Sequence, residues 1–180
     1  MTFKALRIAL VTAAVVLAAP ALAQAQKAKP GTGGAQPTPL GQFGDWQAFQ
    51  LGTAKSKSCF AISNPKDRKP EGLNRDPATF FVTHRPGEGV HNEISLIVGF
   101  PMKEGSEAAI TIGKSNYSLY TKETNAWVKN AAEEGTVIAV MKKSRDLTFH
   151  GTSKRGNKTT DRYSLAGLSN ALDAISKACP

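Results

Sequence analysis

Four cations near the C-terminal end of the chain have the clearest capacity for chemistry. They are Lys154, Arg155, Lys158 and Arg162, and the first two lie in the glycine-bounded segment 151–156. Lysine and arginine bind phosphate and carboxylate oxygens, and loops on a rigid scaffold often carry binding residues. The segment lacks the G-x-x-x-x-G-K-[ST] spacing of a phosphate-binding P-loop. We predict an anion-binding surface at these four residues; the alternative is a solvated turn without a ligand.

Two histidines, His84 and His91, flank a Pro-Gly-Glu-Gly turn and can face each other across a hairpin. A zinc-type site would need a third ligand, and Glu88 and Glu93 are the nearby carboxylates. No recognised metal spacing is present, so we favour a surface hairpin and predict neither a metal nor a cofactor.

Catalytic motifs are absent from the sequence. There is no G-x-S-x-G nucleophile motif. Glycoside hydrolysis needs two carboxylates placed together, and the pattern brings no two of the available ones together: Asp45, Glu93, Glu104 and Glu107. We therefore predict a protein that is not an enzyme. A hydrolase of envelope glycans or lipids and a purely structural envelope component are the alternatives.

The two tryptophans are expected to be core or edge aromatics, as is usual for Trp in a β-sandwich. Trp46 lies in an aromatic-rich segment, whereas Trp127 lies in a polar one. For Trp127 the alternative is a ring on which a glycan stacks.

The chain begins with the pattern of an export signal. Lys4 and Arg7 precede the uncharged apolar run 8–19, and Pro20 and the A-x-A site 21–23 follow. The apolar run is too short to span a bilayer. We predict a signal peptide over residues 1–23, cleaved near Ala23, and a periplasmic or secreted protein. A short uncleaved anchor is the alternative.

Export bears on the two cysteines, Cys59 and Cys179. The periplasm is oxidising, so an even number of cysteines behind a signal peptide favours a disulfide, and with two the pairing is forced. A catalytic thiol is the alternative, but neither cysteine lies in a C-x-x-C pair or beside a histidine.

Net charge and composition indicate which partners suit the protein and where its domain begins. The formal net charge of the 180 residues is +9, and loss of Lys4 and Arg7 with the signal leaves +7. This charge suits anionic partners, including peripheral contact with a membrane surface. The lack of long runs of like charge argues against a nucleic-acid tail. Residues 24–39 are rich in Gly, Pro and Gln and predict a flexible linker, leaving 40–180 as a single domain.

The elements of that domain are mostly short strands separated by Gly and Pro, expected at 43–49, 59–62, 79–84, 93–98, 108–112, 117–120, 147–149 and 163–166. Such a pattern predicts an antiparallel β-sandwich or barrel-like sandwich. Helical spacing of Leu168, Leu172, Ile175 and Cys179 predicts a C-terminal helix capped by Ser169 and tied by the disulfide. A short helix is also expected over 133–143, because acidic residues at its start and two lysines at its end match the helix dipole.

An ordered set of short segments resembles the invasion-associated locus B family of alphaproteobacteria. The segments are Gly44–Trp46, Ser58–Cys59, Phe80–Pro86, Val98–Pro101, Ala126–Trp127, Met141–Lys143, Gly151–Gly156, Tyr163–Gly167, Ala171–Leu172 and Lys177–Cys179. The resemblance implies an exported, envelope-associated protein with a β-rich fold and supplies no catalytic residues. Together with the lack of a catalytic motif, this leads us to predict that the protein acts by binding or interaction, in host-cell invasion or in envelope integrity.

Overall fold

The computed structural model describes residues 36–53 and 56–180, which belong to one compact unit spanning residues 34–180. The predicted signal peptide 1–23 and most of the predicted linker 24–39 lie outside the described residues. The first strand begins at Thr38, two residues before the predicted start of the domain. In the described residues, every helix falls short of the length and apolar character needed to cross a membrane.

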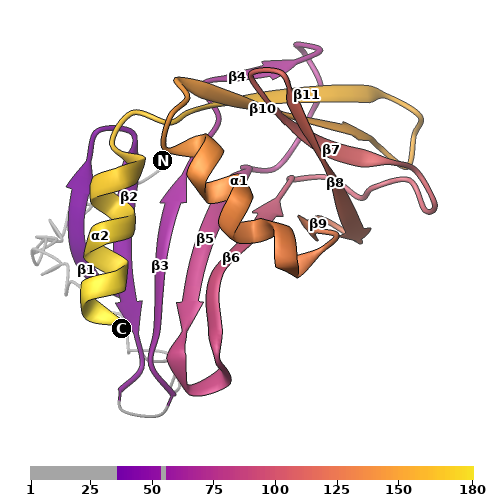
Figure 1. Ribbon diagram of the computed structural model, residues 1–180. Coiled ribbons are helices and arrows are strands. Elements are labelled where there is room, and N and C mark those ends of the chain that lie inside the picture. The colour runs from indigo at the N-terminus through magenta and orange to yellow at the C-terminus, as the bar shows by residue number, and fades with distance from the viewer. Residues whose placement is uncertain (1–35, 54–55) are drawn as a thin grey trace, which may run out of the picture. The chain divides into compact units, whose positions relative to one another are not determined.

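In the described part of the chain, eleven strands form one antiparallel sheet in the order β1-β2-β3-β5-β6-β9-β8-β7-β10-β11-β4 (Figure 1). Their bounds are β1 Thr38–Phe43, β2 Trp46–Leu51, β3 Ser58–Ser63, β4 Asp67–Lys69, β5 Thr79–Arg85, β6 Val90–Ile97, β7 Ala108–Ile112, β8 Ser115–Lys122, β9 Asn125–Val128, β10 Asp146–Thr152 and β11 Lys158–Ser164. Buried and less buried residues alternate along most strands, as expected when one face of a sheet packs on a core.

The sheet turns back on itself, so that strands distant in the sheet order share a core. The strands β10 and β11 cross over the ends of β3 and β5 (Figure 1). Phe80 on β5 contacts both Trp46 on β2 and Tyr163 on β11, at ring-centroid distances of 5.9 and 5.6 Å. Trp46 Nε1 also donates a hydrogen bond of 3.0 Å to the carbonyl oxygen of Ser164. The predicted sandwich-like antiparallel fold is confirmed, as is the core position of Trp46.

Some strand predictions need correction. The segment 43–49 is two strands, because Gly44 has φ +57 and forms a two-residue turn with Asp45, so that Phe43 pairs with Trp46. The strands β4 and β9 were not predicted. Both are short. The strand β4 is extended because it pairs with β11, far along the chain, whereas β9 forms a tight hairpin with β8 and also pairs with the distant β6.

Two α-helices are present in the described residues, α1 over Glu134–Met141 and α2 over Leu168–Ala178. Both confirm the predicted helices, and 3₁₀ turns occupy Pro86–Glu88 and Ala131–Glu133. The predicted cap of α2 is wrong, because Gly167 precedes the first helical residue in place of Ser169. Gly167 has φ +91, and a Cβ at this position would collide with the backbone of Phe43. Only glycine can therefore make this close turn into the helix.

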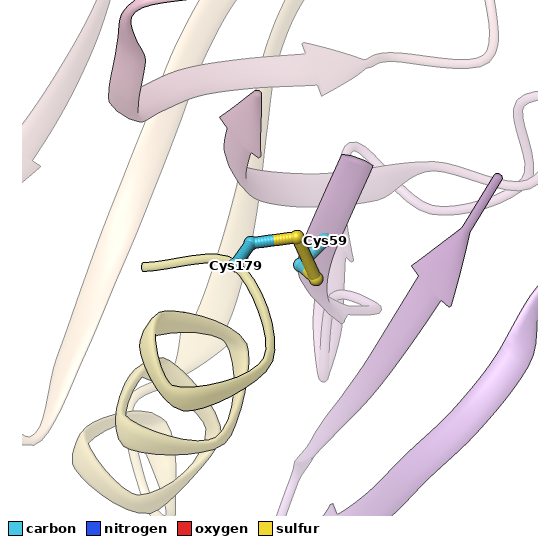
Figure 2. The surroundings of a disulfide bond; sticks show 2 residues. All are labelled: Cys59 and Cys179. Carbon is cyan, nitrogen blue, oxygen red and sulfur yellow. A yellow bond between two sulfur atoms is a disulfide. The ribbon is translucent and has the colours of Figure 1, made fainter. Parts of the chain in front are cut away.

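The disulfide joins Cys59 on β3 to Cys179 at the end of α2 (Figure 2), with the two Cα atoms 5.9 Å apart. Both cysteines are fully buried. The predicted pairing is confirmed, and it holds the buried face of α2 against the same side of the sheet that carries Trp46. Neither cysteine is available as a free catalytic thiol.

Candidate functional site

The predicted cation cluster lies partly on a tight hairpin between β10 and β11. The strands stay paired up to Thr152 and Lys158, which leaves residues 153–157 as the connection, called the basic turn below. The N–H of Ser153 donates to the carbonyl oxygen of Asn157 at 2.9 Å, and the N–H of Asn157 donates to Ser153 Oγ at 3.1 Å. This closed geometry holds Lys154 and Arg155 at the tip, where both are exposed.

A cavity of about 370 Å³ opens beside the basic turn and is called the turn cavity. Its other walls are residues 73–76 and 99–101. Cationic side chains come from Lys154, Arg155 and Arg75, and apolar surface comes from Phe100 and Pro101. An apolar pocket with a few convergent charged groups is the usual form of a site for a small ligand or a ligand segment.

Backbone contacts hold the walls of the turn cavity together. The N–H of Lys154 donates to the carbonyl oxygen of Pro101 at 2.8 Å, and the N–H of Asp76 donates to that of Gly99 at 2.9 Å. Gly99 has φ +74, and a Cβ there would overlap the Asp76 carbonyl. The cavity therefore depends on a backbone approach that glycine alone permits.

A buried ion cluster lies behind the cavity. The carboxylate of Asp161, on β11, accepts hydrogen bonds of 3.1 Å from both Arg68 Nε and an Arg75 terminal nitrogen, and Asp161 is fully buried. Arg68 also donates to the backbone oxygens of Asp76 and Val98. Burial raises the pKa of the Asp161 carboxyl, and the two guanidinium groups oppose that shift. Two arginines on one carboxylate leave excess positive charge next to the cavity.

The structure separates the four predicted anion-binding residues. Lys154 and Arg155 line the turn cavity, whereas Lys158 lines a different cavity of about 410 Å³ beside β7 and β10. Arg162 lies within β11 opposite Thr148, and its nearest acidic partner is Asp146 at 3.8 Å. Side chains along a strand are spread over its length and both faces, so the sequence cluster does not form one patch.

The two histidines lie side by side, as the sequence allowed, but the nearby carboxylates of Glu88 and Glu93 bind Arg85. The rings of His84 and His91 are 5.6 Å apart, and His84 Nε2 lies 3.2 Å from Asn92 Oδ1. Burial lowers the pKa of His84. Glu88 and Glu93 both accept hydrogen bonds from Arg85. Within residues 36–53 and 56–180, no group of three metal-ligating side chains comes together.

Two of the four carboxylates considered for hydrolysis are held in ion pairs. Asp45 lies 2.5 Å from Lys66 Nζ, whose hydrogen bond lowers the pKa of the carboxyl. Glu93 is bound by both terminal nitrogens of Arg85. Glu104 and Glu107 line different cavities. These four carboxylates are therefore not paired with one another.

Trp127 lies on β9 and is partly exposed, opposite Ser95 of β6 and Tyr120 of β8. Its ring centroid is 5.8 Å from that of Tyr120, and the two ring planes differ by 31°. Tyr120 is 55% exposed. Trp127 is therefore neither a core residue nor on an edge strand: it lies partly exposed on β9, between β6 and β8.

Sequence reasoning did not identify Arg75, Asp161 or Tyr120 as part of the site. Arg75 and Asp161 are 86 residues apart, and no local motif links them. Tyr120 carried a usable signal, because it follows the inward-facing Leu119 in a strand and must point outward.

The open antiparallel sheet, the disulfide-tied C-terminal helix and the cationic cavity define a small disulfide-bonded β-protein of a class typical of oxidising compartments. Residues 46–176 match the family described as Invasion associated locus B (IalB) protein, and the chain belongs to this family.

A solved structure supports the same fold. The crystal structure of invasion associated protein b from Bartonella henselae is similar, with a TM-score of 0.55 and 12% identity over 77% of this chain and 95% of that chain. At this identity the likeness establishes the fold alone. Among curated proteins, no sequence matches this chain.

Proposed function

We propose that the protein acts outside the cytoplasm by binding an anionic ligand of the bacterial envelope or of a host surface, rather than by catalysis. The observation that carries the proposal is the convergence of Lys154, Arg155 and Arg75 on one cavity. The family and the Bartonella henselae neighbour, both named for invasion, support a role in host-cell invasion. A part in envelope integrity is the alternative within the same binding function.

The electrostatics of the turn cavity favour an anion. Neither Lys154 nor Arg155 forms an ion pair with another described residue, so both charges are available to a ligand. The apolar surface of Phe100 and Pro101 lowers the local dielectric constant, and charges interact more strongly there than in bulk water.

The proposed compartment is the periplasm or the exterior. A disulfide such as Cys59–Cys179 persists under oxidising conditions, which supports a location outside the cytoplasm. Cleavage of the signal peptide near Ala23 and peripheral contact with an anionic membrane belong to the same proposal.

The test compares two double variants with the same change in charge. One is Lys154→Gln with Arg155→Gln, at the turn cavity. The matched control is Lys142→Gln with Lys143→Gln, two exposed lysines at the end of α1. Retention on lipopolysaccharide and on anionic liposomes is measured from 0.05 to about 0.5 M salt, over which the Debye length shortens to a few ångströms. We expect the first variant to lose the salt-sensitive retention and the control to keep most of it.

Equal retention of the two variants would show that net charge alone drives the interaction, and the turn cavity would be rejected as the site. Folding is checked by thermal unfolding, which should hardly change because exposed charges contribute little to stability.

A further inference from the structure

We propose that the turn cavity is one end of a groove for an acidic polysaccharide, and that Tyr120 and Trp127 form the other end. This inference rests on the proposed function and names the class of ligand. It also unites two features that are far apart in sequence, the basic turn and the exposed aromatic pair.

A second cavity connects the two ends. It measures about 830 Å³, lies between residues 101–105 and 120–124, and is called the β8 cavity. Pro101 and Lys154 line both cavities, so the two adjoin at these residues. Tyr120 also lines the β8 cavity, and Trp127, which lines neither cavity, lies against Tyr120. An extended ligand can therefore pass from the turn cavity, over Pro101, to the aromatic pair.

Backbone hydrogen bonds on two sides hold the segment 98–103, most of whose residues line the two cavities. The N–H groups of Val98 and Met102 donate to the carbonyl oxygens of Thr124 and Glu123, at 2.9 and 2.8 Å. On the other side, the N–H of Lys103 donates to the carbonyl oxygen of Thr152 at 2.9 Å. The groove is therefore largely preformed, which reduces the entropy lost when a ligand binds.

The charges along the groove match an acidic polymer. Five cationic side chains line the two cavities against three acidic ones, and one of the five, Arg75, is already paired with the buried Asp161. The cations are Arg75, Lys103, Lys122, Lys154 and Arg155, and the acids are Asp76, Glu104 and Glu123. The cations are distributed along both cavities. A ligand with acidic groups at intervals can pair with more of them than a single small anion can.

The aromatic end matches a sugar ring. A pyranose has an apolar face of C–H groups, which removes aromatic surface from water when it packs on Tyr120 or Trp127. Ser95 and Asn125 stand on the same face of the sheet, since Ser95 pairs with Trp127 and Asn125 with Lys122 next to Tyr120. Their hydroxyl and amide groups can donate to and accept from sugar hydroxyls.

The experiment measures binding of the mature protein to polygalacturonate, to neutral dextran and to phosphatidylglycerol vesicles. The groove variant is Tyr120→Ala with Trp127→Ala, and its matched control is Tyr120→Phe with Trp127→Phe, which keeps an aromatic ring at both positions. We expect the alanine variant to bind polygalacturonate about tenfold more weakly, the loss expected for stacking contacts. Its dependence on salt should stay that of the wild type, because no charge changes. The phenylalanine variant should bind nearly as the wild type does.

Tryptophan emission provides a second readout. Trp46 is fully buried, so a shift of emission on adding polygalacturonate reports Trp127. Wild type should show this shift, and dextran should produce little because it lacks acidic groups.

Three results would overturn the inference. The first is wild-type affinity of the alanine variant for polygalacturonate, which rejects the aromatic end while leaving anion binding at Lys154 and Arg155 intact. The second is a loss of vesicle binding by the alanine variant that equals its loss of polygalacturonate binding. This result would identify an anionic membrane surface as the ligand of the groove. The third is equal binding of dextran and polygalacturonate, which removes the role of the cations. By contrast, failure of the proposed function appears as wild-type binding by the Lys154→Gln, Arg155→Gln variant.

Discussion

At the scale of single residues, Asp161 organises the charge of the site. It is buried beneath the turn cavity and shared by Arg68 and Arg75, and it keeps Arg75 directed along one wall. A buried carboxylate that holds two arginines adds little net stability over apolar packing, because desolvation of the charges offsets much of their attraction.

Removal of Asp161 should nevertheless be costly. The Asp161→Ala change leaves two guanidinium groups without their carboxylate, and breaking a buried ion pair in this way costs about 3–5 kcal/mol. Urea unfolding measures the change in free energy of unfolding. The control is Asp146→Ala, whose partner Arg162 lies 3.8 Å away and is half exposed; surface pairs contribute below about 1 kcal/mol. Similar values for the two variants would contradict the structural role of Asp161.

At the scale of elements, the helix α2 and the β10–β11 hairpin differ in which of their residues are apolar and which are charged. The helix buries Leu168, Ala171, Leu172 and Ile175 along one face, and the face lies on β1, β2 and β3. The hairpin has no apolar face at its tip and carries charge there instead. The first element stabilises the fold, and the second carries the residues that we propose bind the ligand.

The Leu172→Ala change tests the packing of α2. Leu172 is buried, and truncation of a core leucine usually costs about 2–5 kcal/mol through lost burial and the cavity left behind. Thermal or urea unfolding measures this loss. The exposed Lys177→Ala change in the same helix should stay within about 0.5 kcal/mol. A loss below about 0.5 kcal/mol for Leu172→Ala would mean that α2 lies free on the surface.

At the scale of the whole domain, long-range links tie the N-terminal strands to the C-terminal elements. The disulfide spans a sequence separation of 120 residues, and Phe80 joins β2 to β11 through its two aromatic contacts. Such links join residues that are far apart in sequence. Their stabilising effect depends on how much conformational freedom they remove from the unfolded chain.

Removal of the disulfide is therefore expected to destabilise the domain. In the chain-entropy description, a loop of this length contributes up to about 5 kcal/mol. The variant Cys59→Ser with Cys179→Ser should unfold at lower temperature and lower urea concentration than the oxidised wild type. Mass spectrometry of the unreduced exported protein should show the loss of two hydrogen atoms relative to the reduced form. Two free thiols in the native exported protein would contradict the pairing.

Much of the fold could be predicted because its signals are local. Alternation along 79–84 and 108–112, helical spacing after Leu168 and the pair of cysteines each depend on neighbouring residues or on a simple count. The strand β4 could not be predicted in this way, because a partner far along the chain supplies its hydrogen bonds. The strand β9 pairs with its sequence neighbour β8 as well as with β6, but its four residues are too few to show a clear alternation. The segment 43–49 is divided into two strands by the left-handed backbone of Gly44. The aromatic residues around Gly44 resembled one continuous strand, so the sequence did not predict this turn.

The site was predicted only in part. Sequence clustering pointed to Lys154 and Arg155 correctly as the exposed tip of a hairpin, but it grouped them with Lys158 and Arg162, which lie elsewhere on the sheet. Closeness in sequence is a poor guide to closeness in space along an extended strand, since each residue advances about 3.3 Å and alternates faces.

The sequence by itself determined the β-rich class, the two helices, the disulfide pairing and the net positive charge, because composition and short-range periodicity decide these properties. The tertiary structure alone decided which charges meet. Arg75 approaches the basic turn and shares Asp161 with Arg68 only because the sheet turns back on itself and brings residues 73–76 beside 99–101 and 153–157. Contacts of this kind depend on the packing of the whole chain, and no segment encodes them separately.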